Sequence, residues 1–146
     1  STSGGIIMLG NHTIRSWSST QKIIALSSGE AEYYGIVKGA SEAIGSRSVL
    51  ADLNVKVRVR LHEDSSAARG VAQRIGIGGK VRHIELSELW VQDQIARGRI
   101  VVHKIDGSEN SSDSLTKHSS GERIAQTLLF CNQAVEVGRH DIMPSV

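Results

Sequence analysis

The hydrophobic period of the sequence changes at Ser27 and Ser28, and this change most restricts what the chain can fold into. Before it, apolar residues occur in short runs such as Ile6–Leu9, as they do in β-strands. After it, they recur every three or four positions as far as about Leu53, as on one face of a helix. The sequence therefore predicts an α/β protein in which strands precede one long helix.

The rest of the chain alternates between strand and helix patterns. Residues 55–61 (VKVRVRL) alternate valine or leucine with basic residues, as a half-buried strand does. The predicted order is strands at 6–9, 13–17 and 23–26, a helix at 28–53, a strand at 55–61, a helix from 64 or 65, a glycine-rich loop at 76–79, a helix at 84–97, a strand at 99–105 and helices from 111–113 and from 119. The first three strands would form an antiparallel meander, and the later strands would be parallel, joined through helices. This order predicts a mixed sheet with flanking helices.

The composition excludes several classes of protein. A chain of 146 residues is long enough for one domain, and with 3% aromatic residues its core must be mainly aliphatic. The single cysteine, Cys131, excludes an internal disulfide and a multi-cysteine zinc site. The net charge of +2 indicates no particular partner, and no apolar run approaches the roughly 20 residues of a membrane span. We therefore expect a soluble intracellular domain without a membrane partner, cut from a longer polypeptide because it does not begin with methionine.

Glu30 and Glu32 lie two positions apart at the start of the long helix, and helix geometry predicts different roles for them. Side chains two positions apart diverge on a helix, so the two carboxylates cannot point at one spot. Ser27 and Glu30 have the spacing of a capping box, whose side chains bind backbone N–H groups at a helix start. Glu30 is therefore predicted to be structural. Glu32 is either an ordinary solvated acid or a carboxylate that overhangs the end of the sheet.

Glu32, Asp64 and Asp113 occupy comparable places: early in the first helix, at the end of a strand and at the start of a late helix. Ligand sites of open α/β sheets gather at such strand ends and helix starts. Converging carboxylates repel one another unless a hard divalent cation lies among them, and Mg²⁺ is the natural candidate. Taken singly, each acid is weak evidence for a site.

The motifs around these acids occur in a recognisable order: SWSS, ALSSGEAEYYG, HEDSSAA, VRHIEL and SDSLTK. Together they resemble the ribonuclease H domain of copia-type retrotransposon polyproteins, and the resemblance covers about residues 1–130. It implies a ribonuclease H-like fold and hydrolysis, dependent on Mg²⁺ or Mn²⁺, of the RNA strand of an RNA–DNA hybrid. It also implies a reverse transcriptase upstream in the same polyprotein, and a location in the cytoplasm (in a virus-like particle) or in the nucleus.

The resemblance assigns roles to individual residues. Glu32, Asp64 and Asp113 correspond to catalytic carboxylates that hold the metal ions. Candidates for contacts with the nucleic acid follow from the HEDSSAA motif and from the basic segment GGKVRHIE; they are Ser65, Lys80, Arg82 and His83.

The chain departs from the family pattern at its N-terminus. The family's first catalytic aspartate lies on a central strand that precedes an S-T-S-G sequence, and this chain starts at STSGG. We therefore expect residues 1–138 to be a ribonuclease H-like domain without its first strand, followed by a tail at 139–146. A catalytically dead remnant that at most binds nucleic acid is the alternative. An unrelated module with an acidic pocket, such as a phospho-acceptor domain, is a third hypothesis, but no acid ends the first strand as it would require.

Overall fold

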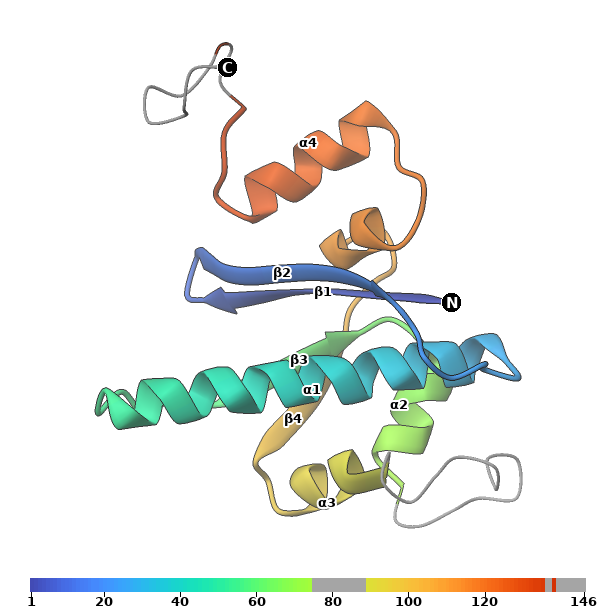
Figure 1. Ribbon diagram of the computed structural model, residues 1–146, viewed down its shortest axis with the longest axis vertical. Coiled ribbons are helices and arrows are strands. Elements are labelled where there is room, and N and C mark those ends of the chain that lie inside the picture. Colours follow the sequence, from blue (N-terminus) through green and yellow to red (C-terminus); the bar gives the residue numbers. More distant parts are fainter. Residues whose placement is uncertain (75–88, 136–137, 139–146) are drawn as a thin grey trace.

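The computed structural model describes residues 1–74, 89–135 and 138. The elements in chain order are β1 (Thr2–Leu9), β2 (His12–Thr20), α1 (Ser28–Asp52), β3 (Val59–Glu63), α2 (Ser66–Ala72), α3 (Trp90–Ala96), β4 (Ile100–Lys104), the 3₁₀ helix η3 (Ser111–Leu115) and α4 (Gly121–Phe130) (Figure 1). Strands and helices are mixed along the chain, so the predicted α/β class is confirmed.

The described strands form two separate pairs and not one continuous mixed sheet; an absent central strand, as expected from the sequence, would leave such a gap. Strands β1 and β2 are an antiparallel hairpin, whose turn contains Gly10 at φ +61°, a conformation that glycine adopts without strain. Strands β3 and β4 are parallel, with Val59 opposite Ile100 and Glu63 opposite Lys104. A parallel pair needs a long connection, and the chain between the two strands carries α2 and α3.

The hydrophobic core lies between α1 and the β3–β4 pair, with α2 and α3 completing it. Tyr33 and Ile36 of α1 are almost fully buried there. The cluster is mainly aliphatic, as the composition predicts, and consists of Tyr33, Ile36, Val37, Ala40, Val59, Ala68, Val71, Ala72, Val91, Ile100 and Val102. The β1–β2 hairpin contributes no residue to this cluster, so α1 and the parallel strands form the stable centre of the molecule.

The prediction of a third strand at 23–26 is wrong. Residues 21–27 connect β2 to α1 without regular structure, and Ile24 and Leu26 are 86% and 72% exposed. The N–H of Leu26 binds the carboxylate of Glu30 at 2.8 Å, so it serves the helix start instead of a neighbouring strand.

Two element boundaries also differ from the prediction. Strand β3 begins at Val59, not at residue 55, because its partner β4 begins opposite that residue. The cap of α4 is Ser120, whose hydroxyl accepts from the N–H of Arg123, one position later than the predicted Ser119. Helix α3 lies within the helix predicted at 84–97, whereas the glycine-rich loop at 76–79 and the tail at 139–146 lie outside the described residues.

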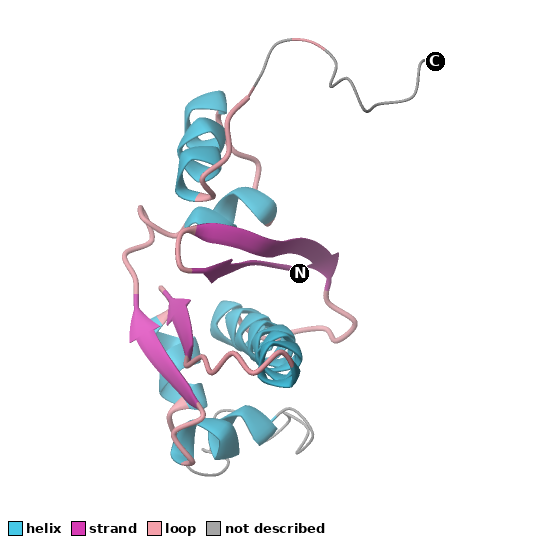
Figure 2. Cartoon of the chain, turned by 90° about the vertical axis from the view of Figure 1, so that its left-hand side faces the viewer, coloured by secondary structure: helices cyan, strands magenta, loops and turns pink. Residues whose placement is uncertain are grey.

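The hairpin lies between two groups of helices. On one side, β1 contacts α1; on the other side, it contacts η3, against which α4 packs (Figure 1). The turned view shows the β3–β4 pair beside α1, separate from the hairpin (Figure 2). Among the described helices, none has the length and apolarity needed to cross a membrane.

Candidate functional site

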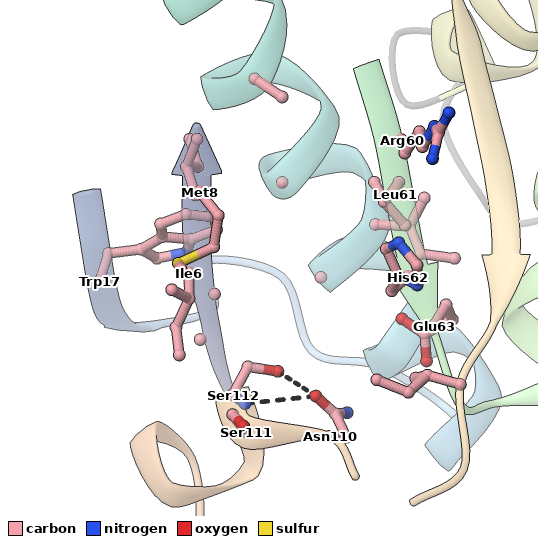
Figure 3. A pocket seen from close by; sticks show the side chains of 18 of the residues that line it. Ile6, Met8, Trp17, Arg60, Leu61, His62, Glu63, Asn110, Ser111 and Ser112 are labelled. Atoms are coloured by element: carbon pink, nitrogen blue, oxygen red, sulfur yellow. Dashed lines mark hydrogen bonds between the residues drawn. The ribbon is translucent and has the colours of Figure 1, made fainter. Parts of the chain in front are cut away.

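A cleft of about 1130 Å³ separates the two strand pairs (Figure 3). Strand β1 and Trp17 of β2 line one wall, and β3 lines the opposite wall. Residues 109–113, before and within η3, also line the cleft, and Figure 3 shows Asn110, Ser111 and Ser112 at the end of the cleft where Glu63 lies. Helix α1 lines it with small residues four positions apart, namely Ala31, Gly35, Gly39 and Ala43. The cleft therefore lies between β1 and β3, two strands that do not pair with each other.

Glu32 lines this cleft from the start of α1, whereas Glu30 serves the helix cap. The hydroxyl of Ser27 accepts a 3.2 Å hydrogen bond from the N–H of Glu30, as the capping box predicts. The Glu32 side chain is exposed to solvent, yet its partial desolvation against the cleft raises the pKa of its carboxyl above the ordinary value. The charges of Asp64 and Asp113 raise this pKa further, while Lys117 opposes them. Asp64 and Asp113 thus both lie within electrostatic reach of Glu32.

Asp113 reaches the site on η3, which Asn110 caps. The side-chain oxygen of Asn110 accepts hydrogen bonds from the N–H and the hydroxyl of Ser112, at 3.3 and 2.6 Å (Figure 3). One carboxylate oxygen of Asp113, Oδ2, lies 2.9 Å from Nζ of Lys117, four residues later. The carboxylate of Asp113 is therefore already neutralised by an ion pair with a lysine of the same chain.

Asp64 follows the last residue of β3, next to a second carboxyl that the sequence analysis missed. Glu63 is buried, and this burial raises the pKa of its carboxyl to about 8. A hydrogen bond from the Ser65 N–H, at 3.0 Å, acts in the opposite direction. A hydrogen bond with the side chain of Asp64 and the charges of Glu32 and Asp64 raise the pKa further. Burial therefore favours the protonated form of Glu63, beside an acid that is predicted to be functional.

The donor chemistry of this site suits a hard divalent cation, but its geometry does not yet form a cage for one. Carboxylate oxygens are the ligands that Mg²⁺ prefers, and mutual repulsion of the acids favours a cation among them. Nevertheless, no three His, Cys, Asp or Glu side chains of residues 1–74, 89–135 and 138 lie close enough together to hold one ion. Asp64 and Asp113 thus influence Glu32 electrostatically, but the three acids do not form a group that could hold one metal ion.

The residues predicted to contact nucleic acid are only partly described. The hydroxyl of Ser65 is the N-cap of α2 and accepts from the N–H of Ala68 at 3.2 Å. It therefore has a structural role, and its contact with nucleic acid stays a prediction. Lys80, Arg82 and His83 lie outside the described residues.

The roles or pairings of four side chains were not found by sequence reasoning. The alternation of Val59, Leu61 and Glu63 places Glu63 on the inward face of β3, and this signal could have revealed it. Lys117 stands at i+4 from Asp113, which is the spacing of a helical ion pair. His62 and His103 stack at 5.4 Å between ring centroids because their strands pair in register, and no local pattern indicates that register.

Comparison with known proteins finds relatives among plant transposons. The chain is 30% identical to the retrovirus-related Pol polyproteins from transposons RE2 and RE1 of Arabidopsis thaliana, over 148 aligned residues and 99% of its length. It is 27% identical, over 118 residues and 80% of its length, to the retrovirus-related Pol polyprotein from transposon TNT 1-94 of Nicotiana tabacum. It spans about a tenth of the length of these relatives, 10%, 10% and 9% respectively. No family model and no solved structure matches it. The chain is therefore homologous to a segment of the retrovirus-related Pol polyproteins of plant transposons.

Proposed function

We propose that the chain is part of a retroelement ribonuclease H domain, which hydrolyses the RNA strand of RNA–DNA hybrids with Mg²⁺ or Mn²⁺. The observation that carries this proposal is the electrostatic contact of Glu32 with Asp64 and Asp113. These acids come from α1, the end of β3 and η3, and they are the three that the ribonuclease H resemblance assigns to metal binding. Homology to Pol polyproteins supports the polyprotein context in which a reverse transcriptase would precede the domain.

In this proposal the three carboxylates are metal ligands rather than proton donors. A divalent ion held there would supply the positive charge that activates a water molecule and stabilises the leaving oxygen. Contacts with the backbone of the hybrid are assigned to the residues that the resemblance indicates: Ser65, Lys80, Arg82 and His83. The expected location is the cytoplasm, in a virus-like particle, or the nucleus.

The fold proposed for the complete domain is ribonuclease H-like, with one more strand in the cleft between β1 and β3. Among the described residues β1 pairs only with β2, and β3 only with β4, so an inserted strand would find an open edge on each side. The small residues of α1 that line the cleft would let a backbone approach the helix closely. The indole N–H of Trp17 is buried without an acceptor among the described residues, and a carbonyl of the inserted strand would satisfy it.

A catalytically dead remnant is the second candidate. It is favoured by one observation, that the acids of the described residues do not form a group able to hold an ion. Such a remnant would keep the fold and bind nucleic acid at most.

Expression of this chain with and without the residues encoded immediately upstream tests the proposal. The assay is Mg²⁺-dependent cleavage of a labelled RNA–DNA hybrid, with double-stranded DNA of the same sequence as the control substrate. We expect the longer chain to unfold more cooperatively and to cleave only the RNA strand. Glu32→Gln and Asp64→Asn should abolish cleavage.

Asp93→Asn is the matched control, because Asp93 lies on α3 in an exposed ion pair with Arg97. This variant should cleave at the rate of the unmodified chain. If the longer chain folds well but never cleaves the hybrid, the remnant hypothesis is correct. If the short chain cleaves as fast as the longer one, the proposal that a further strand completes the domain is wrong.

A further inference from the structure

Lys117 is held at the acidic end of the cleft by both its backbone and its side chain. Its N–H donates to the carbonyl of Asp113 at 3.0 Å, and its Nζ donates to Asp113 Oδ2 at 2.9 Å. Lys117 lines the same cleft as Glu32 and Asp113. The ammonium group therefore belongs to the acidic site and not to a separate patch of surface.

The pKa of Lys117 reflects electrostatic interaction with acids of α1, of η3 and of the residue after β3. The hydrogen bond with Asp113 is the main reason why the pKa of Lys117 lies above its ordinary value; burial opposes the rise, and the charges of Asp113, Glu32 and Asp64 add to it. Lys117 in turn counteracts the rise in the pKa of Glu32. One positive charge thus contacts the carboxylate of Asp113 and acts at longer range on Glu32 and Asp64.

We propose that Lys117 is the built-in counter-ion of the acidic site and that its ammonium must leave Asp113 before a divalent cation can bind there. This inference rests on the proposed function, because it takes a divalent cation as the ligand of the site. A dication and an ammonium group cannot both contact Asp113 Oδ2 without strong repulsion. Lys117 thus competes with the metal ion for the carboxylate.

The side chain is suited to such an exchange. Its exposed fraction is 61%, against 28% for the side chain of Asp113, so the ammonium can move into water while the carboxylate stays in place. Lysine carries its charge on a flexible stem, and exposed ion pairs are only weakly stabilising. The pair therefore neutralises the site in the absence of metal and opens at little cost when metal arrives.

Titration of the full chain with Mn²⁺ tests the inference without any assay of activity. Free Mn²⁺ is followed by electron paramagnetic resonance at low salt and pH 8, where most carboxyl groups are ionised. We expect Lys117→Met to bind Mn²⁺ about three- to tenfold more tightly than the unmodified chain, since it removes a cation close to the site. A second measurement is the NMR signal of the Lys117 ε-methylene, which should shift as diamagnetic Mg²⁺ displaces the ammonium.

Arg97→Met is the matched control. Arg97 pairs with Asp93 at the same i, i+4 spacing, at 2.7 Å, on α3. Its removal lowers the net charge equally and should leave Mn²⁺ affinity unchanged. An equal gain in both variants would mean a general effect of charge and would overturn the role of Lys117.

Failure of the inference and failure of the proposed function give different results. If the unmodified chain binds Mn²⁺, Asp64→Asn weakens the binding, and Lys117→Met does not strengthen it, the metal site stands and the counter-ion role is wrong. If no variant binds Mn²⁺, including Lys117→Met, both the counter-ion role and the proposed metal site are wrong for this chain.

Discussion

The hydroxyl of Tyr34 donates a 2.8 Å hydrogen bond to Oε1 of Glu30, one helical turn earlier in α1. The other oxygen of this carboxylate, Oε2, accepts from the N–H of Leu26 at 2.8 Å. Glu30 is only 4% exposed, so both bonds are shielded from water. Two positions later, Glu32 faces the acidic site instead. The two glutamates of GEAEYY therefore serve stability and the candidate site separately.

This separation predicts that matched alanine substitutions of the two glutamates differ in their effect on the free energy of unfolding. Glu30→Ala leaves the Leu26 N–H and the Tyr34 hydroxyl without the carboxylate that accepts from them, and should lower the free energy of unfolding by about 2 kcal/mol or more. Glu32→Ala removes the repulsion of an exposed carboxylate by Asp64 and Asp113, and should change that free energy by less than about 0.5 kcal/mol or raise it. Urea unfolding at pH 7 measures both. The opposite ranking would contradict the assignment of Glu30 as the cap.

Glu63 predicts a pH dependence of stability with a definite sign. Its pKa in the folded protein is about 8, above the ordinary value of 4.5, so the folded state binds the proton more tightly than the unfolded state does. The stability that this protonated carboxyl contributes is fully present below about pH 4.5, and it is lost as the pH rises to about 8. Over this range the free energy of unfolding should fall by an amount on the order of a few kcal/mol.

Glu63→Gln is the variant that checks this origin. A glutamine keeps an oxygen that can accept from the Ser65 N–H but carries no titrating proton. Urea unfolding of the variant should show a flatter dependence on pH and a higher stability than the unmodified chain at pH 8. An unchanged slope between pH 5 and pH 8 would show that other groups cause it.

Local signals predicted the parts of the fold that local interactions form. The hairpin, the long helix and the Ser27–Glu30 cap depend on residues close in sequence, and each is present. The strand expected at 23–26 failed because the Leu26 N–H binds Glu30, which the apolar pattern does not reveal. The start of β3 was misplaced because its partner β4, some 40 residues later, determines where pairing begins.

The candidate site was predictable in part for the same reason. Strand ends and helix starts indicated Glu32, Asp64 and Asp113, and the charges of both aspartates act on Glu32 in the fold, while the role of the three acids stays a prediction. The pKa of Glu63 depends on burial between elements, and the role of Lys117 depends on three acids that are far apart in the sequence. Those properties arise only when the chain folds.

Arg123 of α4 should control the order of the loop that leads to Asp113. Its guanidinium donates to the carbonyl oxygens of Asn110 at 3.0 Å, Gly107 at 3.4 Å and Ser108. Arg123→Ala should therefore lower the free energy of unfolding by about 1–2 kcal/mol and speed amide hydrogen exchange across residues 108–116. Arg123→Lys should not restore the protection, because an ammonium group lacks the planar fork that reaches several carbonyls. Full protection in the lysine variant would mean that charge alone holds the loop.

Gly39 offers a test of whether a further strand fills the cleft. A Cβ at this position would lie 3.7 Å from Leu61 Cδ1 and 3.9 Å from Trp17 Cζ2, so a larger side chain would extend between the two walls. A Cβ at Gly45, also in α1, would meet nothing within 4 Å. Replacing either glycine with leucine gains about 0.8 kcal/mol of helix propensity, and only Gly39→Leu also fills the cleft.

The two variants should therefore diverge only when the upstream residues are present. In the chain of 146 residues, Gly39→Leu should stabilise at least as much as Gly45→Leu, because its side chain gains apolar contacts in the cleft. In the longer chain, Gly39→Leu should destabilise by about 1–3 kcal/mol, since leucine and strand would compete for one space, while Gly45→Leu should still stabilise. Urea unfolding of the four proteins measures the difference. If Gly39→Leu has the same effect in both lengths of chain, the upstream residues do not occupy the cleft, and the two strand pairs stay separate in the longer protein.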